Sequence, residues 1–160
     1  MNAAHFHLML NHIPVLGTIF GMALLALALW RKSEELKRVA LGTFVIVALL
    51  AVPVYLTGEP AEEVIMPLPD VSDSIVEQHE TAGTIAFSGI VALGVGAIAG
   101  LIQFRGGKAI PSWFGTTALV FSLIVSGAMG WTANLGGKAR HVELRSETIS
   151  PAKNSKASND

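Results

Sequence analysis

The sequence contains no cysteine, and few of its residues are charged. The absence of cysteine excludes disulfide bonds, iron–sulfur clusters, thiolate metal sites and covalently attached c-type haem. Charged residues make up 14% of the chain, whereas soluble domains typically carry about 25%. The segment before the first apolar run also lacks Lys and Arg, which argues against a cleaved signal peptide. These absences predict an integral membrane protein.

Four long stretches without Asp, Glu, Lys or Arg predict four transmembrane helices. Each holds roughly 20 or more residues, enough to cross a hydrocarbon core of about 30 Å. We expect an all-α, four-helix membrane domain at 1–144, followed by a polar, disordered tail at 145–160. The predicted helices cover about 9–30, 39–57, 75–104 and 112–135.

The basic residues predict the orientation of the helices. The loop Arg31–Arg38 holds four Lys or Arg residues and the loop Arg105–Lys108 holds two, whereas 1–30 and 58–78 hold none. By the positive-inside rule, the two short loops face the cytoplasm. Both termini and the long second connection then lie on the outer side, which is the periplasm in a Gram-negative bacterium. The expected location is the bacterial inner membrane.

All five histidines are predicted to lie at this outer face. Imidazole is the commonest protein ligand for haem iron, zinc and copper. His12 and His79 each stand where a different helix enters the bilayer, so we expect them to bind one haem b iron from opposite sides. Two imidazoles leave no open position on the iron, which favours electron transfer, from a quinol in the bilayer to a periplasmic acceptor. His7 and His141 are the alternative ligands. Asn134 and Trp131 are expected to contact the propionates or the edge of the haem ring.

A zinc or copper site is an alternative interpretation of the same residues. Of the 12 acidic residues, seven lie between Glu59 and Glu80, near the histidines. A mixture of imidazole and carboxylate suits such ions. A third interpretation is an accessory subunit of a larger membrane complex or a homo-oligomer. Its histidines would then serve only as polar anchors at the membrane–water interface. The candidate ligands are His5, His7, His12, His79 and His141 with Glu59, Glu62 or Glu63.

Small residues predict where the helices pack. Gly17-x-x-x-Gly21 and Gly96-x-x-x-Gly100 would let neighbouring backbones approach closely. Other motifs are absent from the sequence: it holds no H-E-x-x-H zinc motif, and no basic patch interleaved with aromatic residues suited to nucleic acid. No charge within the apolar stretches marks an ion path, so transport is not expected.

Two short segments resemble a known family. HLMLNHIPV at 7–15 is similar to the H-P-x-x-V-H-F-P-I opening of small bacterial membrane proteins catalogued as domain of unknown function 2231. His79 stands where that family has a histidine early in its third helix, and NLGG at 134–137 resembles its H-L-G-G. Leu8 replaces a proline of the family pattern, and Asn134 replaces a histidine. The resemblance covers about residues 5–140 and implies a four-helix membrane fold with a histidine site for haem.

Overall fold

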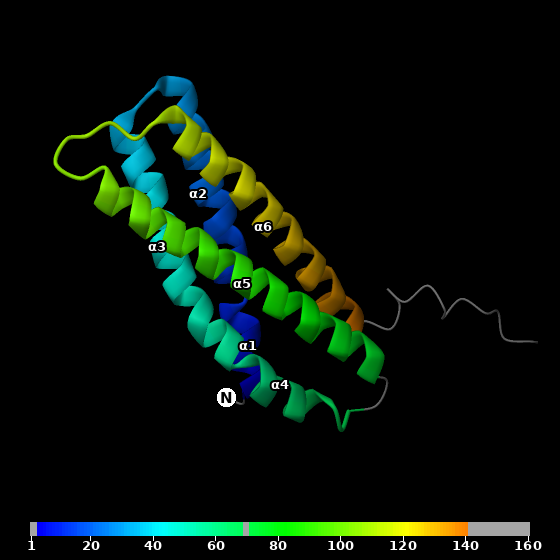
Figure 1. Ribbon diagram of the computed structural model, residues 1–160. Coiled ribbons are helices and arrows are strands. Elements are labelled where there is room, and N and C mark those ends of the chain that lie inside the picture. Colours follow the sequence, from blue (N-terminus) through cyan, green and yellow to red (C-terminus); the bar gives the residue numbers. More distant parts are fainter. Residues whose placement is uncertain (1–2, 69–70, 141–160) are drawn as a thin grey trace, which may run out of the picture.

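The computed structural model describes residues 3–68 and 71–140, and within these ranges it contains helices and no strand (Figure 1). Helices that continue one another form four spans long and apolar enough to cross a membrane. This confirms the predicted all-α fold and identifies a multi-pass membrane protein. The predicted tail lies outside the described residues. The helices are α1 (Ala3–Leu10), α2 (His12–Arg31), α3 (Glu34–Leu56), α4 (Gly58–Ile65), α5 (Asp73–Gln103) and α6 (Ser112–Arg140).

The first span starts earlier than predicted and is interrupted at Asn11. Pro14 has no N–H, so the Leu10 carbonyl loses the donor that a helix would supply four residues later. The Asn11 N–H still donates to the His7 carbonyl, at 2.9 Å. The chain is therefore helical on both sides of Asn11. Pro14 weakens the hydrogen bonding where α1 meets α2, and it does not mark the start of the span.

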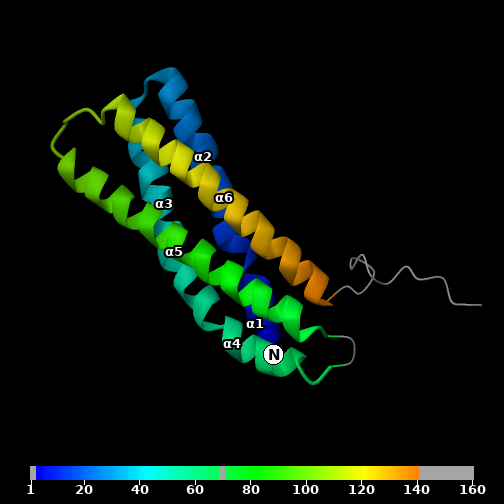
Figure 2. The same cartoon turned by 45° about the vertical axis from the view of Figure 1, so that its right-hand side comes forward.

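A second break divides α3 from α4. Pro53 lies inside α3, and the helix ends three residues later, at Leu56. The Thr57 hydroxyl donates to the Pro53 carbonyl at 2.9 Å and so satisfies one of the carbonyl acceptors at the end of the helix. Helix α4 then turns away from α3 and packs against α1 (Figures 1 and 2). The two proline-broken spans thus contribute one short helix each to the same end of the molecule.

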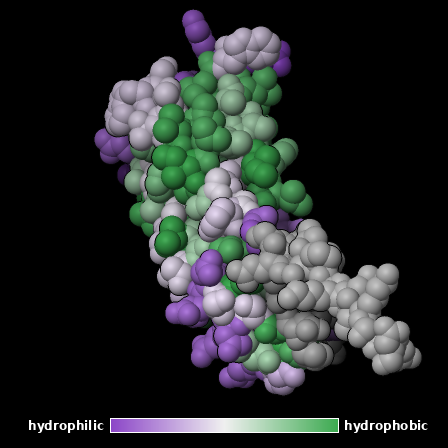
Figure 3. All heavy atoms as spheres, turned by 90° about the vertical axis from the view of Figure 1, so that its right-hand side faces the viewer, coloured by the Kyte–Doolittle hydropathy of each residue, from purple (hydrophilic) through white to green (hydrophobic). Residues whose placement is uncertain are grey.

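The long helices α2, α3, α5 and α6 form the core as a ring, in which α3 packs against α2 and α5, and α6 packs against α5 and α2. Glycines set the closest approaches: a Cβ added at Gly94 would lie 2.4 Å from the Cβ of Ala48, and one at Gly17 would lie 2.6 Å from Val47. A Cβ added at Gly96 would meet nothing within 4 Å. The predicted contact at Gly96 is therefore wrong, and Gly94 takes that role. Hydrophobic side chains cover the middle of the face shown in Figure 3, with hydrophilic ones toward its two ends.

One end of the molecule, here the loop end, carries the connections 32–33 and 104–111. There the buried Lys37 donates to Glu34 Oε1 at 2.7 Å and to the Ile110 carbonyl at 2.8 Å. Glu34 Oε2 accepts from the Ile110 N–H at 2.7 Å. Arg38 donates to the carbonyls of Phe104 and Lys108, both at 2.7 Å. These bonds, here the loop clamp, fasten the α5–α6 connection to the start of α3.

Replacement of Lys37 by alanine is expected to lower the free energy of unfolding by about 2 kcal/mol, because it leaves the buried Ile110 carbonyl without its charged donor. Unfolding in mixed detergent and dodecyl sulfate micelles measures the change. Lys108→Ala is the control, since it also removes one positive charge, from an exposed side chain of the α5–α6 connection. Its effect is expected to stay within about 0.5 kcal/mol. Equal losses in the two variants would contradict a stabilising role for the clamp.

Candidate functional site

The opposite end, here the histidine end, contains α1, α4, the start of α5 and the end of α6 (Figure 1). Within the described residues its closest backbone contacts join α1 with α4 and α5 with α6. The histidine end therefore consists of two layers of helices. Four of the five histidines lie here, as the sequence predicts for one face, and His141 lies outside the described residues.

His7 projects from α1 and is partly buried. Its Nδ1 lies 3.1 Å from the Val54 carbonyl oxygen and 3.2 Å from Thr57 Oγ1. A carbonyl oxygen only accepts, so Nδ1 carries the proton and donates it. The Val54 carbonyl belongs to the last turn of α3, where helical donors run out. The neutral ring therefore keeps the lone pair of Nε2 for a ligand.

His79 projects from the second layer and is bound in the same way. Its Nδ1 donates to the Thr132 carbonyl of α6 at 2.9 Å, so its Nε2 also holds a lone pair. A Cβ added at Gly136 would lie 3.0 Å from Cε1 of the ring. Because Gly136 has no side chain, the His79 ring can pack directly against the backbone of α6.

His7 and His79 both lie at the histidine end, on helices α1 and α5. They come from the first and the third membrane span and lie on the two layers of the histidine end. Each ring is fixed by a main-chain carbonyl, and each presents Nε2 as its free nitrogen. We refer to these two residues as the histidine pair.

His12, the expected partner of His79, is exposed, as is His5. Its Nδ1 donates to the Leu8 carbonyl one turn earlier, at 3.2 Å. Five residues separate His12 from His7, a rotation of about 140° around a helix, so the two rings leave on different sides. The structure therefore brings His7, and not His12, toward the interior at this end, and the ligand role of His12 stays a prediction.

Asn11 was not among the candidates, yet it follows His7 by one turn and so shares its helix face. Its Oδ1 is buried and has no hydrogen-bond partner within residues 3–68 and 71–140. A buried acceptor without a donor costs free energy unless a bound molecule supplies the donor. The spacing of four residues from His7 is the signal in the sequence that could have identified it.

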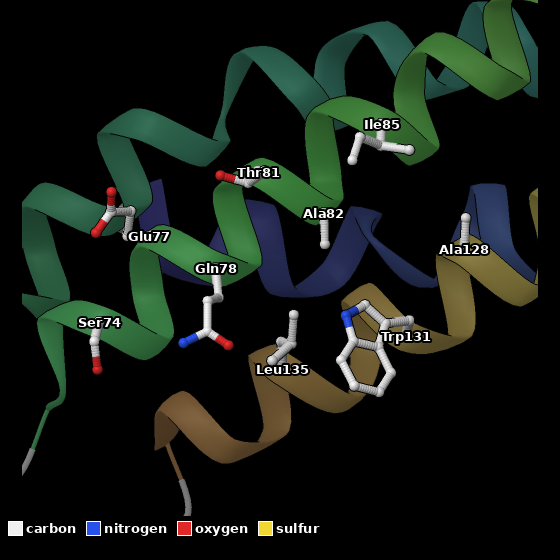
Figure 4. A pocket seen from close by; sticks show the side chains of 9 residues that line it. All are labelled: Ser74, Glu77, Gln78, Thr81, Ala82, Ile85, Ala128, Trp131 and Leu135. Carbon is white, nitrogen blue, oxygen red and sulfur yellow. The ribbon is translucent and has the colours of Figure 1, made fainter.

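The residues expected beside a haem edge lie on α6, the helix whose Thr132 carbonyl holds His79. Asn134 and Trp131 are exposed, with 60% of Trp131 accessible. Trp131 lines an open groove of about 490 Å³ between α5 and α6 (Figure 4). The role of both residues beside a haem stays a prediction.

The predicted zinc or copper site is not assembled in the described part of the chain. Within residues 3–68 and 71–140, no group of three or more His, Asp or Glu side chains could hold a metal ion. Glu59 and Glu63 on α4 are exposed, and Glu62 is partly exposed. The carboxylates of α4 therefore do not converge with the histidines, because α4 packs its Ala61 side against the protein and turns its acidic residues outward.

No protein-family model, no curated protein and no solved structure matches the chain. The resemblance of 7–15 and 134–137 to the proteins of unknown function 2231 accordingly stays a prediction. The function therefore has to rest on the geometry of the histidine pair and its surroundings.

Proposed function

We propose that the protein is a b-type cytochrome of the membrane, in which His7 and His79 would hold one haem. One observation carries the proposal. Two partly buried imidazoles, from different membrane spans, each donate Nδ1–H to a main-chain carbonyl and each keep Nε2 free. Metal-ligating histidines are commonly held in this way, because the second-shell bond fixes the tautomer and makes the ring a better donor to the metal.

The residues present fit the group in two respects. The donor set is two neutral imidazoles, which are ligands that haem iron accepts. His7 lies in the layer of α1 and α4 and His79 in the layer of α5 and α6, and in the described part of the chain the backbones of these layers make few close contacts with each other. When bound, the haem would supply reversible one-electron oxidation and reduction.

The residues around the histidine pair orient the two imidazole rings. The carbonyls of Val54 and Thr132 set the rotation of the two rings. Gly136 leaves space for the His79 ring, which a larger residue would displace. Ligation by both rings excludes oxygen and water from the iron, so the function supported best is electron transfer.

The proposed location is the bacterial inner membrane, with the histidine end facing outward. The loop end carries Arg31, Lys32, Lys37 and Arg38 on one connection and Arg105 and Lys108 on the other. Clusters of basic residues beside membrane spans stay on the cytoplasmic side. The histidine end would then face the periplasm, where an electron acceptor could reach it.

The experiment that tests the proposal is the reduced-minus-oxidised absorption spectrum of the detergent-purified protein, expressed with ample haem precursor. We expect the sharp α and β bands of six-coordinate b-type haem, with about one haem per chain by pyridine extraction. Elemental analysis of the same sample is the companion measurement. A flat spectrum would contradict the proposal, and stoichiometric zinc or copper in that sample would favour the alternative site.

A further inference from the structure

The groove between α5 and α6 is a second feature of the histidine end, distinct from the histidine pair. Its α5 wall runs from Ser74 to Ile85, a length of about 16 Å at the rise of an α-helix. Gln78 on α5 and Trp131 and Leu135 on α6 point into the space between the two helices (Figure 4). Its volume of about 490 Å³ falls in the range of small-molecule sites. Because Ile85 and Trp131 are 62% and 60% exposed on a membrane helix, the groove opens sideways to the lipid.

The polarity of the groove changes along its length. Ser74, Glu77 and Gln78 lie in the first turns of α5, at the end where the span meets water. Ile85 and Ala128 lie farther along, toward the middle of the bilayer. A molecule that fits this order has a polar head near the membrane surface and an apolar tail directed into the lipid.

The charges at the groove disfavour an anionic head. Among the residues that the structure describes, its lining contains Glu77 and no Lys or Arg. The phosphate of an anionic lipid or the carboxylate of a fatty acid would be repelled there, since neither meets a cation. The Gln78 amide can both donate and accept, and the Trp131 indole adds an N–H donor and a flat ring. A hydroxylated or carbonyl-bearing aromatic ring matches these groups.

We propose that this groove binds the head of a lipid-soluble quinol or quinone, with Gln78 hydrogen-bonded to a ring oxygen and Trp131 against the ring. The redox role of that ligand rests on the function proposed above. Gln78 of the groove directly precedes His79 on α5, and Leu135 of the groove directly precedes Gly136 on α6. The groove and His79 therefore lie side by side at the contact between α5 and α6. Oxidation of a quinol to a quinone releases two electrons and two protons. A haem held by the histidine pair would accept these electrons one at a time, and the rim carboxylate of Glu77 would take up the protons and release them to the aqueous phase.

Tryptophan fluorescence tests the binding without any need for haem. The chain has three tryptophans, and Trp30 and Trp113 lie at the loop end. A variant with Trp30→Phe and Trp113→Phe retains only Trp131, and its partner with Trp30→Phe and Trp131→Phe retains only Trp113. A benzoquinone carrying a decyl chain is titrated into each purified variant in micelles. We expect saturable quenching of Trp131 and only weak, non-saturating quenching of Trp113.

A matched pair of glutamine variants identifies the contact. Gln78→Leu in the Trp131-only protein is expected to raise the apparent Kd about tenfold, the cost of one lost hydrogen bond to a ligand. Gln103→Leu makes the same change at the exposed other end of α5 and is expected to leave the Kd unchanged.

Two results would overturn the inference. One is equal, non-saturating quenching of both tryptophans, which would show partition into the micelle alone. The other is displacement of the quinone by phosphatidylethanolamine or phosphatidylglycerol at equal concentration, which would make the groove a phospholipid site. Because the readout is independent of haem, quinone binding by a protein with a flat haem spectrum would leave the groove inference standing and refute the proposed function.

Discussion

The His79→Ala variant is expected to lose the reduced α band of the haem, and its haem content should fall by more than about tenfold relative to the unchanged protein. His79 belongs both to the ligand pair expected from the sequence and to the pair proposed here. Its ring is held by the Thr132 carbonyl and lies against Gly136 of α6. The haem content is measured by pyridine extraction and the band by the reduced-minus-oxidised spectrum.

Two companion variants decide which residue is the second ligand. His7→Ala is expected to lose the haem as His79→Ala does, because it removes the partly buried ring that donates to Val54. His12→Ala is the matched control: it deletes a histidine five residues away that is exposed. We expect it to retain a full haem complement. The reverse pattern, with haem lost in His12→Ala and kept in His7→Ala, would refute the ligand assignment and restore the pair expected from the sequence.

The Gly94→Val variant is expected to lose about 2–3 kcal/mol of unfolding free energy. The first carbon of the new side chain would lie 2.4 Å from the Cβ of Ala48, which belongs to the neighbouring helix and cannot rotate away. Helices α3 and α5 must separate to admit it, and contacts along both are weakened. Denaturation in mixed detergent and dodecyl sulfate micelles measures the loss.

Gly96→Val, two residues farther along α5, is the matched control for this substitution. It makes the same change of helix propensity, but the added Cβ meets nothing within 4 Å. Its unfolding free energy is expected to stay within about 0.5 kcal/mol of the unchanged protein. If the two variants lose the same stability, then the change in propensity and not the close packing of α3 with α5 is responsible.

The number of membrane spans and their helical type could be predicted, because uncharged stretches of membrane length have few other solutions. The start of the first span could not. The first span begins at Ala3, well before Pro14, because a proline in a membrane helix can be accommodated as a break. The division of the second span at Thr57 depends on Pro53 together with the packing of α4 on α1, which the sequence does not reveal.

The sequence does not show which histidine of the first span faces inward, and the reason lies in the same apolar composition. A soluble helix has a polar face that shows which side is buried, whereas these helices are apolar on all sides. The sequence therefore indicates a histidine on the first span without revealing whether His7 or His12 faces inward. Gly94 and Gly96 pose the same problem, since only the position of Ala48 on another helix distinguishes them. His79 could be identified because it is the single histidine of its span.

The two ends of the molecule differ in how much must break before they open. At the loop end, the charged bonds of Lys37 and Glu34 tie α3 to the α5–α6 connection. At the histidine end, the layers of α1 with α4 and of α5 with α6 share few close backbone contacts, and both short helices follow breaks. Local unfolding starts where the fewest packed contacts oppose it. In the proposed cytochrome, haem would accordingly enter by a partial opening at the histidine end while the rest of the bundle stays folded.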